Sequence, residues 1–148
     1  MKLIFVCTGN TCRSPLAESI AKKLMPNDDI QSRGLFAMEG QKISKESLQL
    51  IHSHHLPKPS NAQQFTLEDL EADLILTMSP SHKDLIKSQY GQYSNVYTIN
   101  EYAGIEGHIE DPFGCSFEVY EKTFQNIYDL LKNCLLYTSP SPRDKRQS

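Results

Sequence analysis

The predicted fold follows from one segment, Cys7-Thr8-Gly9-Asn10-Thr11-Cys12-Arg13-Ser14. A short apolar run, residues 3–6, precedes it, and residues 15–21 follow with helical spacing. The octapeptide is therefore predicted to form the turn between a buried strand and a helix. Such a turn directs successive backbone N–H groups and a helix start at one point, which attracts anions and phosphate above all. We expect Cys7 at the base of this cradle and Arg13 at its rim.

The residue types in this turn suit phosphoryl transfer. A helix N-terminus and a neighbouring guanidinium stabilise a thiolate nucleophile, and the planar fork of Arg13 can hold two phosphate oxygens. The reaction these groups favour is attack by Cys7 on phosphorus to give a cysteinyl-phosphate. The loop donors would stabilise charge on the equatorial oxygens. The predicted phosphate-binding residues are Thr8, Gly9, Asn10, Thr11, Cys12 and Arg13.

Outward from the turn, strands and helices alternate, which predicts an α/β domain with a parallel sheet. Strands are predicted at residues 2–7, 28–35, 73–78 and 95–99. The first helix is expected after Ser14 as its N-cap, with Pro15 in the first helical position. Further helices are predicted at 43–52, with Leu48 and Ile51 facing inward, after Ser79, and over the apolar stripe of Phe117, Tyr120, Phe124, Ile127 and Leu131. Residues 103–114 are expected to form a loop.

Length and composition limit the class of protein. The chain has 148 residues, which suits one domain, and a net charge of −3, which gives no basic surface for nucleic acid. No apolar stretch approaches the roughly 18 residues of a membrane span. Without a secretory signal, the four cysteines are interpreted as thiols and the cytoplasm as the location. Residues 136–148 lack apolar periodicity, so we expect residues 1–135 to form the domain and 136–148 a disordered or non-native tail.

The octapeptide near the N-terminus, together with Asp111-Pro112-Phe113 before the last helix, resembles the low-molecular-weight protein tyrosine phosphatases over residues 1 to about 134. The resemblance implies a three-layer, flavodoxin-like arrangement with a four-stranded parallel sheet flanked by helices. It also implies Cys7 as nucleophile, Arg13 as phosphate clamp and Asp111 as the acid that protonates the leaving group and then deprotonates water. Three positions match residues that hold the loop in shape: Asn10, Ser14 and Ser32.

Thr11 refines the substrate class. Many tyrosine-directed members carry a bulky aliphatic residue there, whereas this octapeptide is similar to the bacterial protein arginine phosphatase branch. The resemblance therefore implies a preference for phosphoarginine, with Asp111 pairing with the guanidinium and Phe113 forming an apolar wall. Thr11 as a mere spacer is the alternative. We expect phosphorylated proteins as substrates, a monomer, no nucleic acid or membrane partner, no cofactor and no metal.

Several alternatives stay open. A phosphotyrosine enzyme is the first, and a non-enzymatic anion-binding module would need no acid at position 111. An arsenate reductase would relay electrons through further cysteines, and residues 73–92 contain none. Cys12 is either an inert small residue or a redox partner that shields Cys7 from irreversible oxidation. His52, His54 and His55 have no further ligand nearby at metal spacing.

Overall fold

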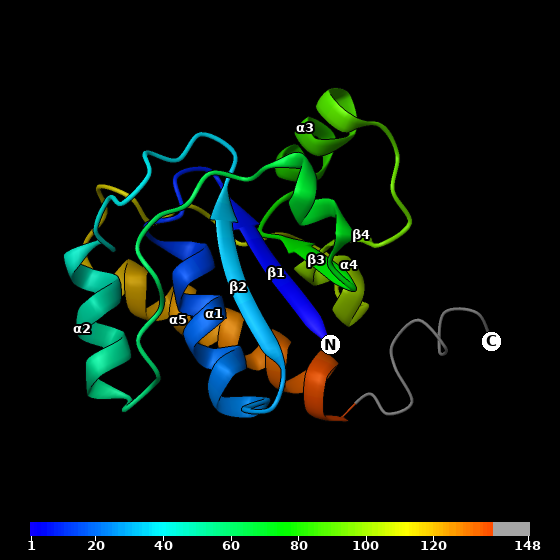
Figure 1. The fold of residues 1–148 in the computed structure, drawn as a ribbon. Helices are drawn as coiled ribbons and strands as arrows, with labels where there is room; N and C mark the ends of the chain where they lie inside the picture. Colours follow the sequence, from blue (N-terminus) through cyan, green and yellow to red (C-terminus); the bar gives the residue numbers. More distant parts are fainter. Residues whose placement is uncertain (138–148) are drawn as a thin grey trace.

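Four parallel strands form the centre of the molecule. In the computed structural model, which describes residues 1–137, the sheet order is β2-β1-β3-β4 (Figure 1). The strands are β1 (Lys2–Cys7), β2 (Asp29–Gly34), β3 (Leu74–Thr77) and β4 (Val96–Thr98). β1 is central because its apolar run can be buried on both faces, and its last residue, Cys7, pairs with Gly34. The predicted α/β class and four-stranded parallel sheet are confirmed.

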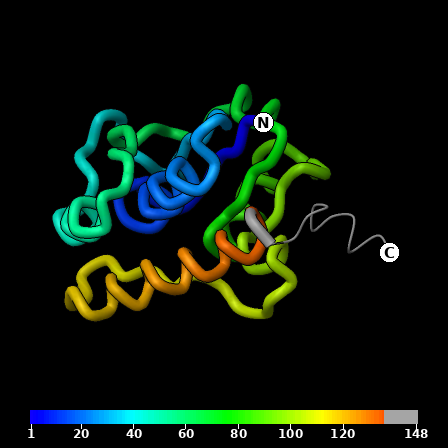
Figure 2. Tube along the Cα trace, turned by 90° about the horizontal axis from the view of Figure 1, so that it is seen from below, coloured from blue at the N-terminus to red at the C-terminus, as the bar shows by residue number. Residues whose placement is uncertain are grey.

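Helices cover both faces of this sheet. Leu3 and Phe5 of β1 belong to the larger core cluster, with residues of α1 (Arg13–Leu24), α2 (Lys45–Ser53), α4 (Ile99–Ala103) and α5 (Phe117–Leu131). Ile4 and Val6 face the other way, toward residues of η1 (Leu67–Glu71) and α3 (Pro80–Tyr90). Figure 2 shows α5 running alongside α1, and a π-helical segment, η2 (Lys132–Tyr137), continues from α5. The alternation of side chains along β1 thus produces the three layers.

Two local expectations were wrong. α1 begins at Arg13 with Cys12 as its N-cap, so Ser14 lies inside the first turn and caps nothing. The hydroxyl of Ser14 is instead bonded to the side chains of Cys7 and Asn10. In α2, Leu50 is buried together with Ile51, whereas Leu48 is only half-buried.

A fourth helix follows β4 where a strand end and a loop were expected. The Thr98 hydroxyl accepts a hydrogen bond from the Glu101 N–H at 3.0 Å, and the Glu101 carboxylate accepts one from the Thr98 N–H at 3.2 Å. This reciprocal capping box stabilises a helix of only five residues. The Thr-x-x-Glu spacing at 98–101 was the signal in the sequence that could have found it.

Two sequence predictions remain outside what the fold can test. The tail expected at 136–148 lies largely outside the described residues, and the 1–135 domain boundary stays a prediction.

Within residues 1–137, none of the helices combines the length and the apolar character required to cross a membrane.

Gly34 brings β2 directly against the loop that follows Cys7. A Cβ at this position would lie 2.7 Å from the Thr8 carbonyl oxygen and 2.9 Å from the Asn10 nitrogen. Both are backbone atoms of the cradle, which cannot rotate away as a side chain would. Glycine is therefore required here for close approach rather than for an unusual φ.

Replacing Gly34 by alanine tests this contact. We expect Gly34→Ala to cost about 1–3 kcal/mol of unfolding free energy, as overpacking does, and to shift the amide resonances of Thr8 and Asn10. Gly40→Ala is the matched control, since it faces open space but has φ +81°. The control should lose stability through backbone strain alone and leave those resonances in place. Unshifted Thr8 and Asn10 amides in Gly34→Ala would contradict the close-approach argument.

Candidate active site

The octapeptide wraps around a crevice at the carboxyl end of β1. Cys7 ends the strand and Arg13 opens α1, so the five residues between them form the cradle wall. The crevice has a volume of about 270 Å³ and is lined by Cys7, Thr8, Gly9, Thr11, Cys12, Arg13, Gln41, Asp111 and Phe113. Asp111 and Phe113 arrive here from a segment a hundred residues away in the sequence. Asn10 is the exception among the predicted phosphate-binding residues, because its side chain is buried beneath the loop.

The buried Asn10 side chain connects three segments. Its backbone has φ 58°, a left-handed conformation that asparagine tolerates better than most residues. The side-chain nitrogen donates to Ser14 Oγ at 2.7 Å and to Ser32 Oγ at 2.9 Å, and the side-chain oxygen accepts from the Gln63 N–H at 2.9 Å. The structure therefore brings together the three residues predicted to support the loop.

Ser14 links this network to the sulfur of Cys7. Its Oγ lies 2.9 Å from Cys7 Sγ and also accepts from Asn10. An ionised sulfur can only accept, so the hydroxyl proton of Ser14 is then available to stabilise the thiolate. Cys7 itself is 2% exposed, which limits access to the sulfur to the crevice.

Glu18 is a member of this network that the sequence analysis missed. Its carboxylate is fully buried, accepts from Ser32 Oγ and forms an ion pair with Lys22 Nζ at 2.6 Å. Because the Ser32 hydroxyl donates its proton to Glu18, the Ser32 oxygen accepts the hydrogen bond from Asn10. Glu18 stands four residues after Ser14, on the same side of α1, and that spacing was the available signal.

Arg13 connects the cradle to the segment that carries Asp111. Its side chain is 6% exposed, Nη1 donates to the Ile109 carbonyl at 3.0 Å, and Nη2 lies 3.7 Å from Asp111 Oδ2. The Nε atom is buried without a hydrogen-bond partner. A buried unsatisfied guanidinium N–H is costly, so this atom is suited to an anionic acceptor placed in the crevice.

Asp111 and Phe113 form the outer part of the crevice. The Asp111 carboxylate is about half exposed, and its Oδ1 accepts from the Phe113 N–H at 3.1 Å. The Phe113 ring is 74% exposed. An exposed ring beside a carboxylate can contact the stem of a side chain that enters the crevice.

His82 is a second buried residue that the sequence analysis missed. Its ring is 3% exposed; Nε2 lies 2.9 Å from Thr8 Oγ1 and Nδ1 lies 3.0 Å from Ser79 Oγ. Burial, and secondly the charge of Arg13, lower the pKa of His82 to about 4. The imidazole borders a second crevice of about 560 Å³ that shares Thr8, Arg13 and Asp111 with the first.

Cys12 contacts the last helix. Its sulfur lies 3.4 Å from the Tyr120 hydroxyl, and burial raises the pKa of that tyrosine well above its usual range. Cys7 and Cys12 are both free thiols, and the redox role of Cys12 stays a prediction.

Among the described residues, no group of three or more potential ligands could hold a metal ion, and His54 stacks on Phe124 with centroids 4.3 Å apart.

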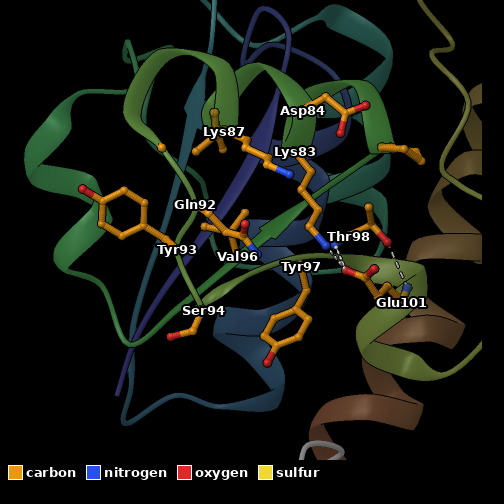
Figure 3. A pocket seen from close by; sticks show the side chains of 13 residues that line it. Lys83, Asp84, Lys87, Gln92, Tyr93, Ser94, Val96, Tyr97, Thr98 and Glu101 are labelled. Atoms are coloured by element: carbon orange, nitrogen blue, oxygen red, sulfur yellow. Dashed lines mark hydrogen bonds and ion pairs between the residues drawn. The ribbon is translucent and has the colours of Figure 1, made fainter.

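A further cavity lies away from the octapeptide, between α3 and β4 (Figure 3). It has a volume of about 520 Å³, and none of the predicted site residues lines it. Lys83 points across it and forms an ion pair with Glu101 at 2.8 Å. That pair joins α3 to the capped start of α4, which is a structural role.

Comparisons with known proteins agree with this geometry. The family model described as low molecular weight phosphotyrosine protein phosphatase matches residues 2–141. The low molecular weight protein-tyrosine-phosphatase PtpB of Staphylococcus epidermidis is 67% identical over 131 residues, covering 88% of this chain and 94% of that protein. PtpB of Staphylococcus aureus is 50% identical, with the same coverage of each.

Solved structures give the same picture. The structure of a YwlE mutant from Bacillus subtilis has a TM-score of 0.85 and 36% identity, and covers 90% of this chain and 95% of that one. The C7S mutant of the YwlE arginine phosphatase, with a phosphorylated active-site serine, has a TM-score of 0.86 and 36% identity, and covers 90% and 92% of the two chains.

The lowered pKa of His82 predicts a pH dependence of stability. The pKa of this ring is about 4 in the folded protein and 6.5 in the unfolded chain. The contribution of neutral His82 to the free energy of unfolding is therefore complete above pH 6.5. It should decline as the pH falls from 6.5 to about 4, by up to about 3 kcal/mol. Urea unfolding across this range measures it. The comparison is with His82→Gln, which cannot titrate there and should show a correspondingly flatter curve; equal slopes for the two proteins would contradict the assignment.

Proposed function

We propose that this chain, which belongs to the low molecular weight phosphotyrosine protein phosphatase family, removes phosphoryl groups from arginine side chains of proteins. The chain is a phosphatase and hence a hydrolase, as its family and its relatives' names indicate. The proposal adds two points: a cysteinyl-phosphate intermediate on Cys7, and phosphoarginine as the substrate. The monomeric state and the cytoplasm stay predictions of the sequence.

In the first step, the Cys7 thiolate attacks phosphorus while the bond from phosphorus to the substrate nitrogen breaks. Arg13 and the loop N–H groups hold the transferred oxygens, and the unpartnered Nε of Arg13 is one such donor. Asp111 gives its proton to the leaving guanidine, which departs as a cation. The position of Asp111 in the wall of the crevice that contains Cys7 supports this role.

In the second step, Asp111 takes a proton from a water molecule that attacks phosphorus. The Sγ–phosphorus bond then breaks, inorganic phosphate leaves and the thiolate is restored. Ser14 stabilises the thiolate as leaving group through its 2.9 Å contact with Sγ. Water is the only co-reactant. The phosphorylated serine in the YwlE variant supports phosphoryl transfer to this position.

The observation that carries the arginine assignment is that Thr11 and Asp111 line the same crevice as Cys7. The Thr11 hydroxyl is a hydrogen-bonding group near the phosphoryl site, where an aliphatic residue could only pack. Once it has given up its proton, the half-exposed carboxylate of Asp111 can pair with the guanidinium cation that departs. The similarity to the YwlE arginine phosphatase supports the same choice.

Phosphotyrosine is the second candidate substrate. The relative with 67% identity is named a protein-tyrosine-phosphatase, and the exposed Phe113 ring can stack on an aromatic ring as well as on an aliphatic stem. Both candidates use the same nucleophile, so the substrate and the mechanism require separate tests.

The mechanism is tested by Cys7→Ser and Asp111→Asn. We expect Cys7→Ser to lose turnover by at least about 10³-fold and Asp111→Asn by about 10²–10⁴-fold, the usual contribution of a general acid. Rapid acid quenching followed by mass spectrometry should detect a phosphorylated Cys7 peptide during turnover. Cys115→Ser, which changes an exposed thiol, should behave as wild type. Undiminished turnover in Cys7→Ser would refute the mechanism.

The substrate assignment is tested by Thr11→Ile. The kcat/KM of wild type is compared for phosphoarginine and phosphotyrosine peptides in the presence of a chelator. Wild type should favour phosphoarginine, and Thr11→Ile should lower that preference by roughly tenfold, the worth of one hydrogen bond. Thr11→Ser retains a hydroxyl and should keep most of the preference. An unchanged ratio in Thr11→Ile would show that Thr11 is a spacer.

A further inference from the structure

Backbone hydrogen bonds join the cradle to the segment that carries Asp111. The Met78 N–H, directly after β3, donates to the Val6 carbonyl of β1 at 2.9 Å, and the Ile109 N–H donates to the Met78 carbonyl at 2.8 Å. The Ile109 carbonyl in turn accepts from Arg13. The turn between β3 and α3 therefore contacts both the cradle and the segment that carries Asp111.

His82 supplies the side-chain connection at this junction. It stands in the first turn of α3, and its two nitrogens contact different segments: Ser79 at the helix N-cap and Thr8 in the cradle. A neutral imidazole has one donor and one acceptor, so it satisfies both hydroxyls at once. The ring is 3% exposed, whereas Thr8 is on the surface of the crevice. The buried His82 ring thus fixes the side chain of Thr8, which would otherwise be held only through its backbone.

Thr8 is the residue immediately after Cys7, so its orientation affects the first backbone N–H groups of the cradle. Its carbonyl oxygen accepts from the Phe36 N–H at 2.9 Å, which fixes the peptide from the side of β2. The hydroxyl contact to His82 fixes it from the side of α3. The loop next to the nucleophile is therefore clamped from both neighbouring segments.

We propose that His82 is a positioning residue for phosphoryl transfer: through the Thr8 hydroxyl it holds the backbone after Cys7 in the orientation that receives the transferred oxygens. The inference rests on the proposed attack by Cys7 and applies to either substrate. Donors held in place beforehand stabilise the transition state more than the ground state. Loss of the contact therefore lowers kcat more than it raises KM.

Two amide variants separate this role from packing. The terminal amide of glutamine can take the place of His Nε2 and keep the contact to Thr8. The shorter asparagine amide corresponds to Nδ1 and keeps only the contact to Ser79. We expect His82→Asn to lower kcat by about 10–100-fold with KM within about threefold, and His82→Gln to recover most of the loss. His55→Asn, on an exposed histidine outside both crevices, is the control.

A double-mutant cycle with Thr8→Val completes the test. Because His82 acts through the Thr8 hydroxyl, Thr8→Val should lose kcat to a similar extent, and adding His82→Asn should cause no further loss. Equal kcat values for the asparagine and glutamine variants, or additive effects in the cycle, would overturn the proposal. Thermal unfolding shows whether the His82 variants fold; should they not fold, a Thr8→Val protein with wild-type kcat still overturns it.

These outcomes are distinguishable from failure of the proposed function. Each variant is assayed on the phosphopeptide that wild type hydrolyses faster. If that peptide is phosphotyrosine, the arginine assignment fails while the His82 comparison proceeds unchanged. If Cys7→Ser remains active, the mechanism fails, and the His82 proposal fails with it.

Discussion

The active-site loop depends on one buried amide. Asn10 adopts a left-handed backbone conformation inside the turn, and its side chain makes three hydrogen bonds to three different segments. A buried polar group without hydrogen-bond partners destabilises the fold. The segments that carry Ser14, Ser32 and Gln63 therefore pack together around the Asn10 side chain. Because Ser14 is one of the partners, the same amide that shapes the loop also orients the hydroxyl beside the Cys7 sulfur.

A charge extends this constraint into α1. Glu18 is fully buried and compensated by Lys22 and by the Ser32 hydroxyl. An uncompensated carboxylate could not be retained at this depth. The network therefore has a fixed direction: the carboxylate accepts from Ser32, which accepts from Asn10, whose second N–H reaches Ser14 and leaves that hydroxyl proton for the sulfur.

The sequence predicted the parts of this architecture that local pattern determines. The apolar run of β1, the octapeptide and the amphipathic stripe of α5 are each readable within about fifteen residues, and the structure confirms all three. The mistake over Ser14 arose because the hydroxyl that favours a helix cap also suits a donor to sulfur. Glu18 and His82 were missed because their partners, Ser32 and Thr8, lie 14 and 74 positions away in the sequence. The short helix α4 was missed because its capping box overlaps the end of a strand.

The guanidinium of Arg13 has a consequence for how the two halves of the crevice communicate. Its Nη1 donates to the Ile109 carbonyl and its Nη2 lies beside Asp111, while its Nε has no hydrogen-bond partner. An anion engaged by Nε and a displacement of the 109–111 segment therefore act on the same rigid, planar group. Thermodynamic linkage makes such an influence reciprocal: a change in the 109–111 segment that alters the affinity for the anion is matched by an equal effect of the bound anion on that segment.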